Sequence, residues 1–211
     1  GFLLLAFSRG RWSENLSAAV GMGSVGLAAL TTVYAGFDFF NQGQQPFTQA
    51  LWTWMHVGTF DIKVNLVLDG LSLTMLSVVT GVGFFIHMFA SWYMRGEEGY
   101  SRFFAYTNLF IASMLFLILG DNLLFIYFGW EGVGLCSYLL IGFYSGQRKN
   151  GDAALKAFIV TRIGDAFMAI GLLILFQQLG TLNIQELLVR APEHFKAGDF
   201  WIVLATLMLL G

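Results

Sequence analysis

The stretch NLLFIYFGWEGVGLCSYLLIGFYS, from Asn122 to Ser145, decides how the rest of the chain folds. Its 24 residues carry a single formal charge, at Glu131. At the usual helical rise, a helix of this length is about 36 Å long and crosses a bilayer. An acid near the centre of such a span costs on the order of 2.5–3.5 kcal/mol on insertion scales. We therefore predict that Glu131 serves the movement of protons or ions.

The composition of the whole chain is that of a membrane protein. Of its 211 residues, 57% are hydrophobic and 11% are charged, whereas a soluble domain carries about 25% charged residues. We therefore predict an all-α polytopic membrane protein. The net charge of −2 argues against a nucleic-acid partner. The single cysteine, Cys136, excludes an internal disulfide, and no Cys/His cluster supports a metal or haem site.

Apolar runs of membrane length recur along the chain. Five full spans are predicted at about 16–36, 69–94, 103–120, 122–145 and 153–178, with partial spans at 1–7 and from about 200. Because partial spans occupy the two ends, we expect the sequence to be a piece from the N-terminal part of a larger chain.

Arginine and lysine are unevenly distributed between the two sets of loops. Six lie on one side, namely Arg9, Arg11, Arg95, Arg102, Arg148 and Lys149, and three lie on the other, namely Lys63, Arg190 and Lys196. The positive-inside rule places the richer set in the cytoplasm. We therefore expect the loops near 9–11, 95–102 and 146–152 to be cytoplasmic, and those at 37–68 and 179–199 to be external.

Both long external loops contain predicted secondary structure. Residues 59–68 alternate, mostly apolar against polar, with Phe60, Ile62, Val64, Leu66 and Leu68 opposite Thr59, Asp61, Lys63, Asn65 and Val67. Together with the run Leu51–Met55, this alternation predicts a short β-hairpin at about 51–68. The segment NIQELLVR, residues 183–190, predicts a short amphipathic helix on the membrane surface.

The span at 153–178 carries two central charges, Arg162 and Asp165. Glu131 lies about 13 Å from the external end of its span, and Asp165 lies about 18 Å from the cytoplasmic end of the next. Because the two spans are antiparallel, the carboxylates lie within roughly 3 Å of each other in depth. We interpret Glu131 as a proton site, since intramembrane acids usually lie on ion pathways. The alternative is a structural, hydrogen-bonded glutamate.

Arg162, Lys156 and His87 complete the set of candidates. Arg162 and Asp165 are three residues apart, so they can pair, and the pair either tunes a carboxylate or only makes two charges tolerable. Lys156 lies one turn from the cytoplasmic end of its span, where snorkelling explains it without a further role. His87 suits a proton relay by its intrinsic pKa, although a hydrogen-bonded interfacial histidine is the more common case. Lys156 and His87 are therefore the weaker candidates.

Other polar and small residues have local explanations. Asp69 and the pair Asp121–Asn122 open predicted helices and are expected to cap them. Small residues form one face of the span that contains Glu131, namely Gly129, Gly132, Gly134 and Ser137. This face permits close helix approach, which either brings a cation and water to the carboxylate or serves packing alone.

Three stretches resemble one family of membrane proteins. They are LVLDGLSLTMLSVVTGVGFFIHM (66–88), DNLLFIYFGWEGVGLCSYLLIGFY (121–144) and KAFIVTRIGD (156–165). They look like the antiporter-like membrane subunits of proton-pumping NADH:quinone oxidoreductase, respiratory complex I, most of all the bacterial L-type and mitochondrial subunit 5-type branch. The resemblance runs from about Arg9 to Gly211. The multisubunit Na+/H+ antiporters are related to the same family.

The resemblance implies an antiporter-like transmembrane helix bundle and a role for its charges. In the family, the glutamate that matches Glu131 pairs with a lysine on the following span but one, and the two form the entry half of a proton channel. That lysine is expected just beyond Gly211. Asp165 and Arg162 match positions implicated in tuning this pair or in structure. The resemblance also divides the chain into an N-terminal antiporter-like region, 1–120, and the start of the proton-channel region, 121–211.

The resemblance further implies a division of labour with partner subunits. This chain is expected to bind no cofactor, because NADH, FMN, iron–sulfur clusters and quinone are bound by partners. The expected partners are other membrane subunits, especially a sister antiporter-like subunit, in a bacterial inner membrane. The expected function is that of a non-redox, proton-translocating subunit of the oxidoreductase. A component of a Na+/H+ antiporter and a structural membrane subunit are the alternatives.

Overall fold

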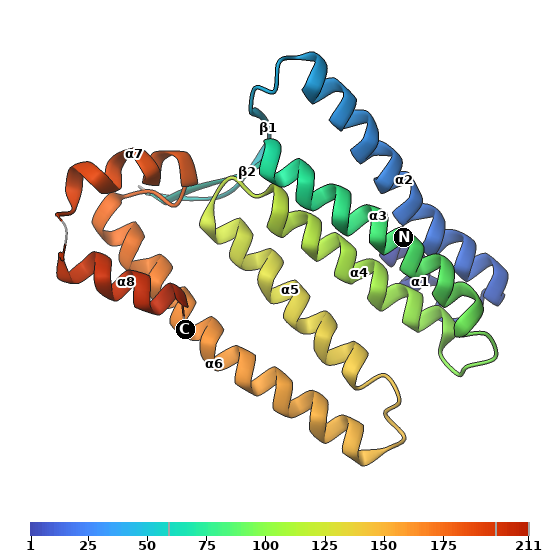
Figure 1. Cartoon of the computed structure of the whole chain (residues 1–211). Coiled ribbons are helices and arrows are strands. Elements are labelled where there is room, and N and C mark those ends of the chain that lie inside the picture. Colours follow the sequence, from blue (N-terminus) through green and yellow to red (C-terminus); the bar gives the residue numbers. More distant parts are fainter. Residues whose placement is uncertain (59, 197, 211) are drawn as a thin grey trace.

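Five long apolar helices form the body of the protein in the computed structural model (Figure 1). The structure describes residues 1–58, 60–196 and 198–210, and for Phe60 it describes the backbone alone. They are α2 (Glu14–Asn41), α3 (Gly70–Tyr93), α4 (Tyr100–Leu119), α5 (Leu123–Ile141) and α6 (Arg148–Leu179). Each is long and apolar enough to cross a membrane. The five predicted full spans are confirmed, and with them the helical membrane fold.

The outer surface of these helices is apolar. Leu27, Leu30, Phe85 and Val160 are between 62% and 68% exposed. A soluble protein rarely leaves so many large apolar side chains in contact with water. In a bilayer the lipid chains cover them, so the surface agrees with the membrane assignment.

Polar residues set the helix ends, and the helices extend beyond the apolar runs. Ser13 caps α2 by accepting a hydrogen bond from the Leu16 N–H at 3.4 Å, and Asp69 forms a capping box with Ser72 at the start of α3. α6 begins at Arg148 rather than near 153, because hydropathy marks the apolar part of a helix and not its hydrogen-bonded end. Lys156 therefore lies about two turns from the start of α6, while its place one turn inside the apolar part of the span stays a prediction.

Three short helices complete the part of the chain that the structure describes, namely α1 (Phe2–Ser8), α7 (Ile184–His194) and α8 (Phe200–Leu210). α7 confirms the predicted amphipathic helix and continues four residues past Arg190. Its Leu187 packs with Leu175 and Leu179 of α6 and with Ala205 of α8. α8 turns back along α6 (Figure 1).

The predicted hairpin is confirmed and is longer than expected. β1 (Phe47–Val57) pairs antiparallel with β2 (Phe60–Leu68), with irregularities between Ala50 and Trp52 and between Thr53 and Met55. β1 begins four residues before the run at 51–55. Nearly all of its residues are exposed, so neither face requires apolar side chains and its sequence shows no alternation of apolar and polar residues. Thr59, part of the predicted alternation, and Gly211, the predicted end of the resemblance, lie outside the described residues.

An asparagine junction, formed by Asp121 with Asn65, Asn122 and Asn183, ties the hairpin to α5 and to the loop before α7. Asp121 Oδ2 accepts hydrogen bonds from Asn65 Nδ2 at 2.7 Å and Asn183 Nδ2 at 2.9 Å, and Oδ1 accepts one from Asn122 Nδ2 at 2.8 Å. Asn122 caps α5, as predicted, through the Phe125 N–H at 2.8 Å. Asp121 itself forms the junction instead of a cap.

Glycines bring α5 close to α4. A Cβ added at Gly129 would lie 2.6 Å from Leu117 N, and one at Gly132 would lie 2.5 Å from Ser113 Oγ. A Cβ at Gly134 would instead lie 3.5 Å from an Arg162 nitrogen. Two of these three glycines therefore serve the packing of α5 on α4.

The two ends of the bundle differ in character. The connections after α1, α3 and α5 lie at one end, and the hairpin and α7 lie at the other (Figure 1). The larger predicted set of basic residues lies in these three connections and in the first turns of α4 and α6. We call this end the basic end.

Candidate functional site

Glu131 of α5 forms an ion pair with Arg162 of α6. Arg162 Nη1 contacts Glu131 Oε2, and Arg162 Nη2 donates a hydrogen bond to the Glu131 carbonyl oxygen at 3.3 Å. The Glu131 and Arg162 side chains are 27% and 26% exposed. Glu131, the one charged residue of the stretch 122–145, thus has a cationic partner, Arg162, on the next span.

Arg162 also contacts Asp165 on its own helix. Nη1 lies 3.2 Å from Asp165 Oδ2, so the predicted contact between the two residues is confirmed. The guanidinium lies over the Phe158 ring, 4.5 Å from its centroid, which restricts its orientation. One arginine therefore stands between two carboxylates. We call Glu131, Arg162 and Asp165 the charge cluster.

Asp165 is the more sheltered of the two acids, with 8% of its side chain exposed. Its Oδ1 accepts a hydrogen bond from Trp130 Nε1 at 2.9 Å. Trp130 directly precedes Glu131 on α5, so the same two helices hold both carboxylates. The similar depth expected for Glu131 and Asp165 agrees with their shared arginine.

His87 lies in a separate histidine network, formed by Ser24 of α2, His87 of α3 and Asn108 of α4. His87 Nδ1 lies 2.7 Å from the Gly83 carbonyl oxygen, and Nε2 lies 3.4 Å from Asn108 Nδ2. Ser24 Oγ donates to Asn108 Oδ1 at 2.5 Å. His87 is 3% exposed, so it is buried between the helices of the bundle.

Lys156 is exposed on α6 and lies outside the charge cluster; within the described part of the chain, no ion pair holds it. Trp130 and Asn108 were not among the residues that the sequence predicted for these sites. An asparagine inside the apolar run 103–120 was a visible signal, whereas nothing in the sequence showed that Trp130 reaches Asp165. Among the described residues, no group of three or more His, Cys, Asp or Glu side chains could hold a metal ion.

Two family models match the chain. One, described as NADH-Ubiquinone oxidoreductase (complex I), chain 5 N-terminus, matches residues 54–104. The other, described as NADH:quinone oxidoreductase/Mrp antiporter, TM, matches residues 120–211. The chain belongs to this antiporter-like family. The resemblance expected from the sequence is confirmed.

Relatives within the antiporter-like family are similar over the whole chain. NADH-quinone oxidoreductase subunit L of Escherichia coli (strain K12) is 71% identical over 211 residues, and that of Pseudomonas aeruginosa is 72% identical over 213. Each alignment covers 100% of this chain and 34% or 35% of the relative. The chain thus spans about a third of the length of these curated relatives.

Solved structures share the antiporter-like fold at low sequence identity. An archaeal membrane-bound sulfane sulfur reductase complex matches with a TM-score of 0.77 and 15% identity over 99% of this chain and 41% of its own. The Mrp complex from Dietzia sp. matches with a TM-score of 0.70 and 22% identity, over 92% of this chain and 22% of its own. These two similarities concern the fold alone.

Proposed function

We propose that the chain is part of a proton-translocating membrane subunit of NADH:quinone oxidoreductase, with the charge cluster at the entry of a half-channel. The observation that carries the proposal is the contact of Glu131 with Arg162 between two membrane-length helices. The 71% and 72% identity to two L subunits supports the assignment to this complex. In this role the chain moves protons, while partner subunits bind NADH, FMN, iron–sulfur clusters and quinone.

The charge balance of the cluster explains how it would respond to another cation. One arginine faces two carboxylates, which leaves one formal negative charge uncompensated. Two unit charges about 4 Å apart interact by about 4 kcal/mol at an effective dielectric constant near 20, or a factor of roughly 10³ in an equilibrium. A lysine brought beside Glu131 by the following span but one would therefore compete with Arg162 on nearly equal terms.

Arg162 has a second partner ready when it leaves the first. Asp165 Oδ2 already lies 3.2 Å from its Nη1. With Arg162 on Asp165, Glu131 is available to hold the protonated lysine. With Arg162 back on Glu131, that lysine loses its counter-charge and releases its proton toward the next site.

The same assignment implies a membrane, a neighbouring subunit and an orientation for the chain. We place the subunit in a bacterial inner membrane beside a sister antiporter-like subunit, with the basic end in the cytoplasm and the hairpin outside. The excess of basic residues at that end supports this orientation. Residues 1–120 then form the N-terminal antiporter-like region, and residues 121–211 begin the proton channel.

The test is Glu131→Gln in the complete subunit within the assembled complex. The substitution keeps the side-chain volume and removes the charge, so we expect NADH oxidation to continue with fewer protons moved per electron pair. Proton yield is measured in inverted vesicles alongside NADH oxidation. Glu186→Gln, which removes an exposed acid of α7, is the matched control and should leave the yield unchanged.

An unchanged proton yield in assembled Glu131→Gln would reject the role of Glu131. A drop in the amount of assembled complex, with a normal yield from the remainder, would instead support the structural-subunit alternative.

A Na+/H+ antiporter component is the second candidate, because the family description that matches residues 120–211 names the Mrp antiporter as well. It predicts sodium-dependent proton exchange without NADH oxidation. Measuring exchange in vesicles with and without sodium, in the absence of NADH, separates the two candidates.

A further inference from the structure

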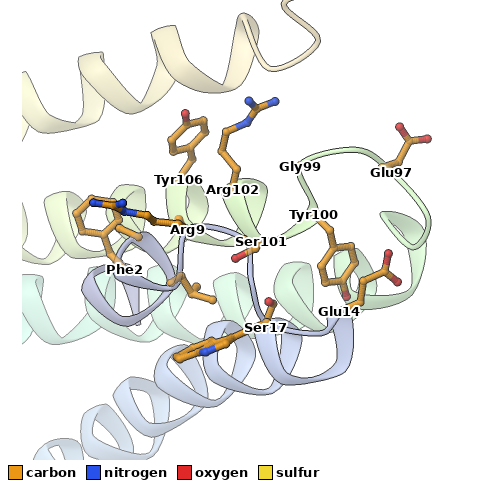
Figure 2. Close-up of a pocket in the computed structure, with 15 residues that line it drawn as sticks. Phe2, Arg9, Glu14, Ser17, Glu97, Gly99, Tyr100, Ser101, Arg102 and Tyr106 are labelled. Carbon is orange, nitrogen blue, oxygen red and sulfur yellow. The ribbon is translucent and has the colours of Figure 1, made fainter.

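A pocket of about 550 Å³ opens at the basic end of the bundle (Figure 2). Its walls are α1, the loop that follows, the first turn of α2, the first two turns of α4, and the connection between α3 and α4. None of its lining residues belongs to the charge cluster or to the histidine network.

Two arginines line one side of the pocket. Arg9 has a left-handed φ of 51°, and its backbone N–H donates to the Ala6 carbonyl oxygen at 3.2 Å. Its side chain makes no hydrogen bond or ion pair with any residue that the structure describes. Arg102 donates one long hydrogen bond, 3.4 Å, to the Phe143 carbonyl oxygen and lies over the ring of that residue. Most of the N–H donors of these two guanidinium groups are therefore available to an anion such as phosphate.

Two buried serine hydroxyls point into the same pocket. Ser17 of α2 is 0% exposed and Ser101 of α4 is 8% exposed, and neither Oγ makes a hydrogen bond within the described part of the chain. Figure 2 shows both hydroxyls directed into the space between α2 and α4. A buried hydroxyl without a hydrogen-bond partner is unfavourable, so a ligand oxygen at this place would be favoured.

Helix starts add partial positive charge. α4 begins after Gly99, which offers no side-chain cap, so the first amides of α4 lack a side-chain acceptor. The first turn of α2 faces the pocket from the other wall, but Ser13 already caps it and it carries the acidic Glu14. The start of α4 is therefore the helix end that favours a negative group.

Acidic residues occupy the opposite side. Glu14 and Glu97 lie across the pocket from the two arginines, and Glu14 Oε1 accepts a hydrogen bond from the Gly96 N–H at 3.1 Å (Figure 2). Two arginines and two glutamates give the lining no net formal charge, but the opposite charges are separated in space. Such a lining suits a ligand that is itself zwitterionic.

The pocket also lies where lipid headgroups lie. It adjoins the ends of membrane-length helices, and apolar and aromatic side chains continue its wall toward the bundle, namely Phe2, Leu5, Trp12, Ala105 and Tyr106. Tryptophan and tyrosine are enriched at this depth of a membrane.

We propose that this pocket binds the headgroup of an amine-bearing phospholipid, of the phosphatidylethanolamine class. The phosphate lies between Arg9, Arg102 and the two serine hydroxyls. The ammonium lies on the side of Glu14 and Glu97. The site is independent of proton translocation by the charge cluster.

The first test uses Arg9→Gln with Ser101→Ala in the complete subunit within its complex. Lipid retained after delipidation and incubation with phosphatidylethanolamine is counted by native mass spectrometry. Loss of one charge-assisted contact and one hydrogen bond should lower the affinity roughly tenfold or more. The matched control, Arg11→Gln with Ser91→Ala, removes an exposed arginine and a half-buried serine that lie at the same end but outside the pocket lining, and it should retain the lipid as the unaltered protein does. Equal retention by the two double variants would overturn the proposal.

The second test reverses the headgroup preference. Glu14→Gln with Glu97→Gln keeps an acceptor for the Gly96 N–H and removes the negative side of the pocket. The unaltered protein should enrich phosphatidylethanolamine from equimolar mixtures with phosphatidylglycerol, and this variant should shift toward phosphatidylglycerol. Enrichment of phosphatidylglycerol by the unaltered protein would overturn the zwitterionic assignment. Inorganic phosphate binding as tightly as the lipid would overturn the lipid assignment.

Discussion

The charge cluster and the histidine network are both polar sites between membrane-length helices, yet they are built differently. The charge cluster holds three formal charges, and Glu131 and Arg162 keep about a quarter of their side chains exposed. In the histidine network, His87 and Asn108 are 3% and 6% exposed, and hydrogen bonds link its members to one another and to backbone carbonyls. The first site has a choice of partners, whereas the second has its partners fixed.

This difference in the choice of partners indicates which of the two sites allows its side chains to move. An arginine shared by two acids can change partner without leaving a charge alone, and the excess negative charge gives it a reason to do so when a cation arrives. A closed hydrogen-bonded network loses a contact with every displacement, which rigidifies the helices around it. We therefore expect changes in the charge cluster to alter proton yield, and changes in the histidine network to alter stability.

The largest effect is expected from Arg162→Ala. It leaves Glu131 and Asp165 without their common cation, so we expect proton yield per electron pair to be lost and less complex to assemble. Arg162→Lys keeps the charge but not the two-sided contact, and should restore assembly more than yield. The measurement is proton yield together with the amount of complex on native gels. A normal proton yield from assembled Arg162→Ala would contradict the claim that the charge cluster, and not the histidine network, governs proton movement.

Asp165→Asn should have the next largest effect. The amide oxygen can still accept the Trp130 Nε1–H, so the fold is kept, but Arg162 loses its second anionic partner and stays on Glu131. We expect assembly near the normal level with proton yield reduced severalfold. Proton yield that matches the unaltered complex would show that Asp165 only makes the arginine tolerable.

Asn108→Leu probes the other site. It removes hydrogen bonds to His87 and Ser24 and should lower stability by about 1–3 kcal/mol, since it leaves buried groups without partners. Proton yield in the assembled fraction should not change. Thermal unfolding in detergent gives the first quantity and vesicle pumping gives the second. A clear loss of yield would place His87 on a proton path and erase the contrast between the two sites.

The smallest effect is expected from Trp130→Phe. It removes one hydrogen bond to Asp165 from a residue that is 50% exposed, worth about 1 kcal/mol. We expect a small decrease in proton yield and little change in assembly. Trp201→Phe, at a tryptophan of α8 that is 43% exposed, is the matched control. Identical yields for the two variants would mean that Trp130 does not position Asp165.

The sequence predicted the spans and the contact within one helix, because both follow from local spacing. Hydropathy located the five long helices, and the three-residue separation of Arg162 and Asp165 indicated their contact. The pairing of Glu131 with Arg162 was not predicted, because it depends on how α5 and α6 are rotated about their axes. The family resemblance directed attention to a lysine beyond Gly211 instead.

Long-range hydrogen bonds escaped prediction for the same reason. Asp121 meets Asn65 and Asn183, which lie 56 and 62 residues away in sequence. Asn65 lies in β2 and Asn183 in the loop before α7, and no pattern in the sequence links them. Helix ends were misplaced where polar residues continue a helix beyond its apolar part, as at Arg148.

The close contact between Gly129 and the backbone of Leu117 makes α5 an immobile part of the bundle. With no room for even a methyl group at that crossing, α5 is held in place against α4, and α4 packs on it more extensively than α6 does. Glu131 is then a negative charge anchored on a fixed helix. Any movement that separates it from Arg162 has to be made by the arginine side chain or by α6.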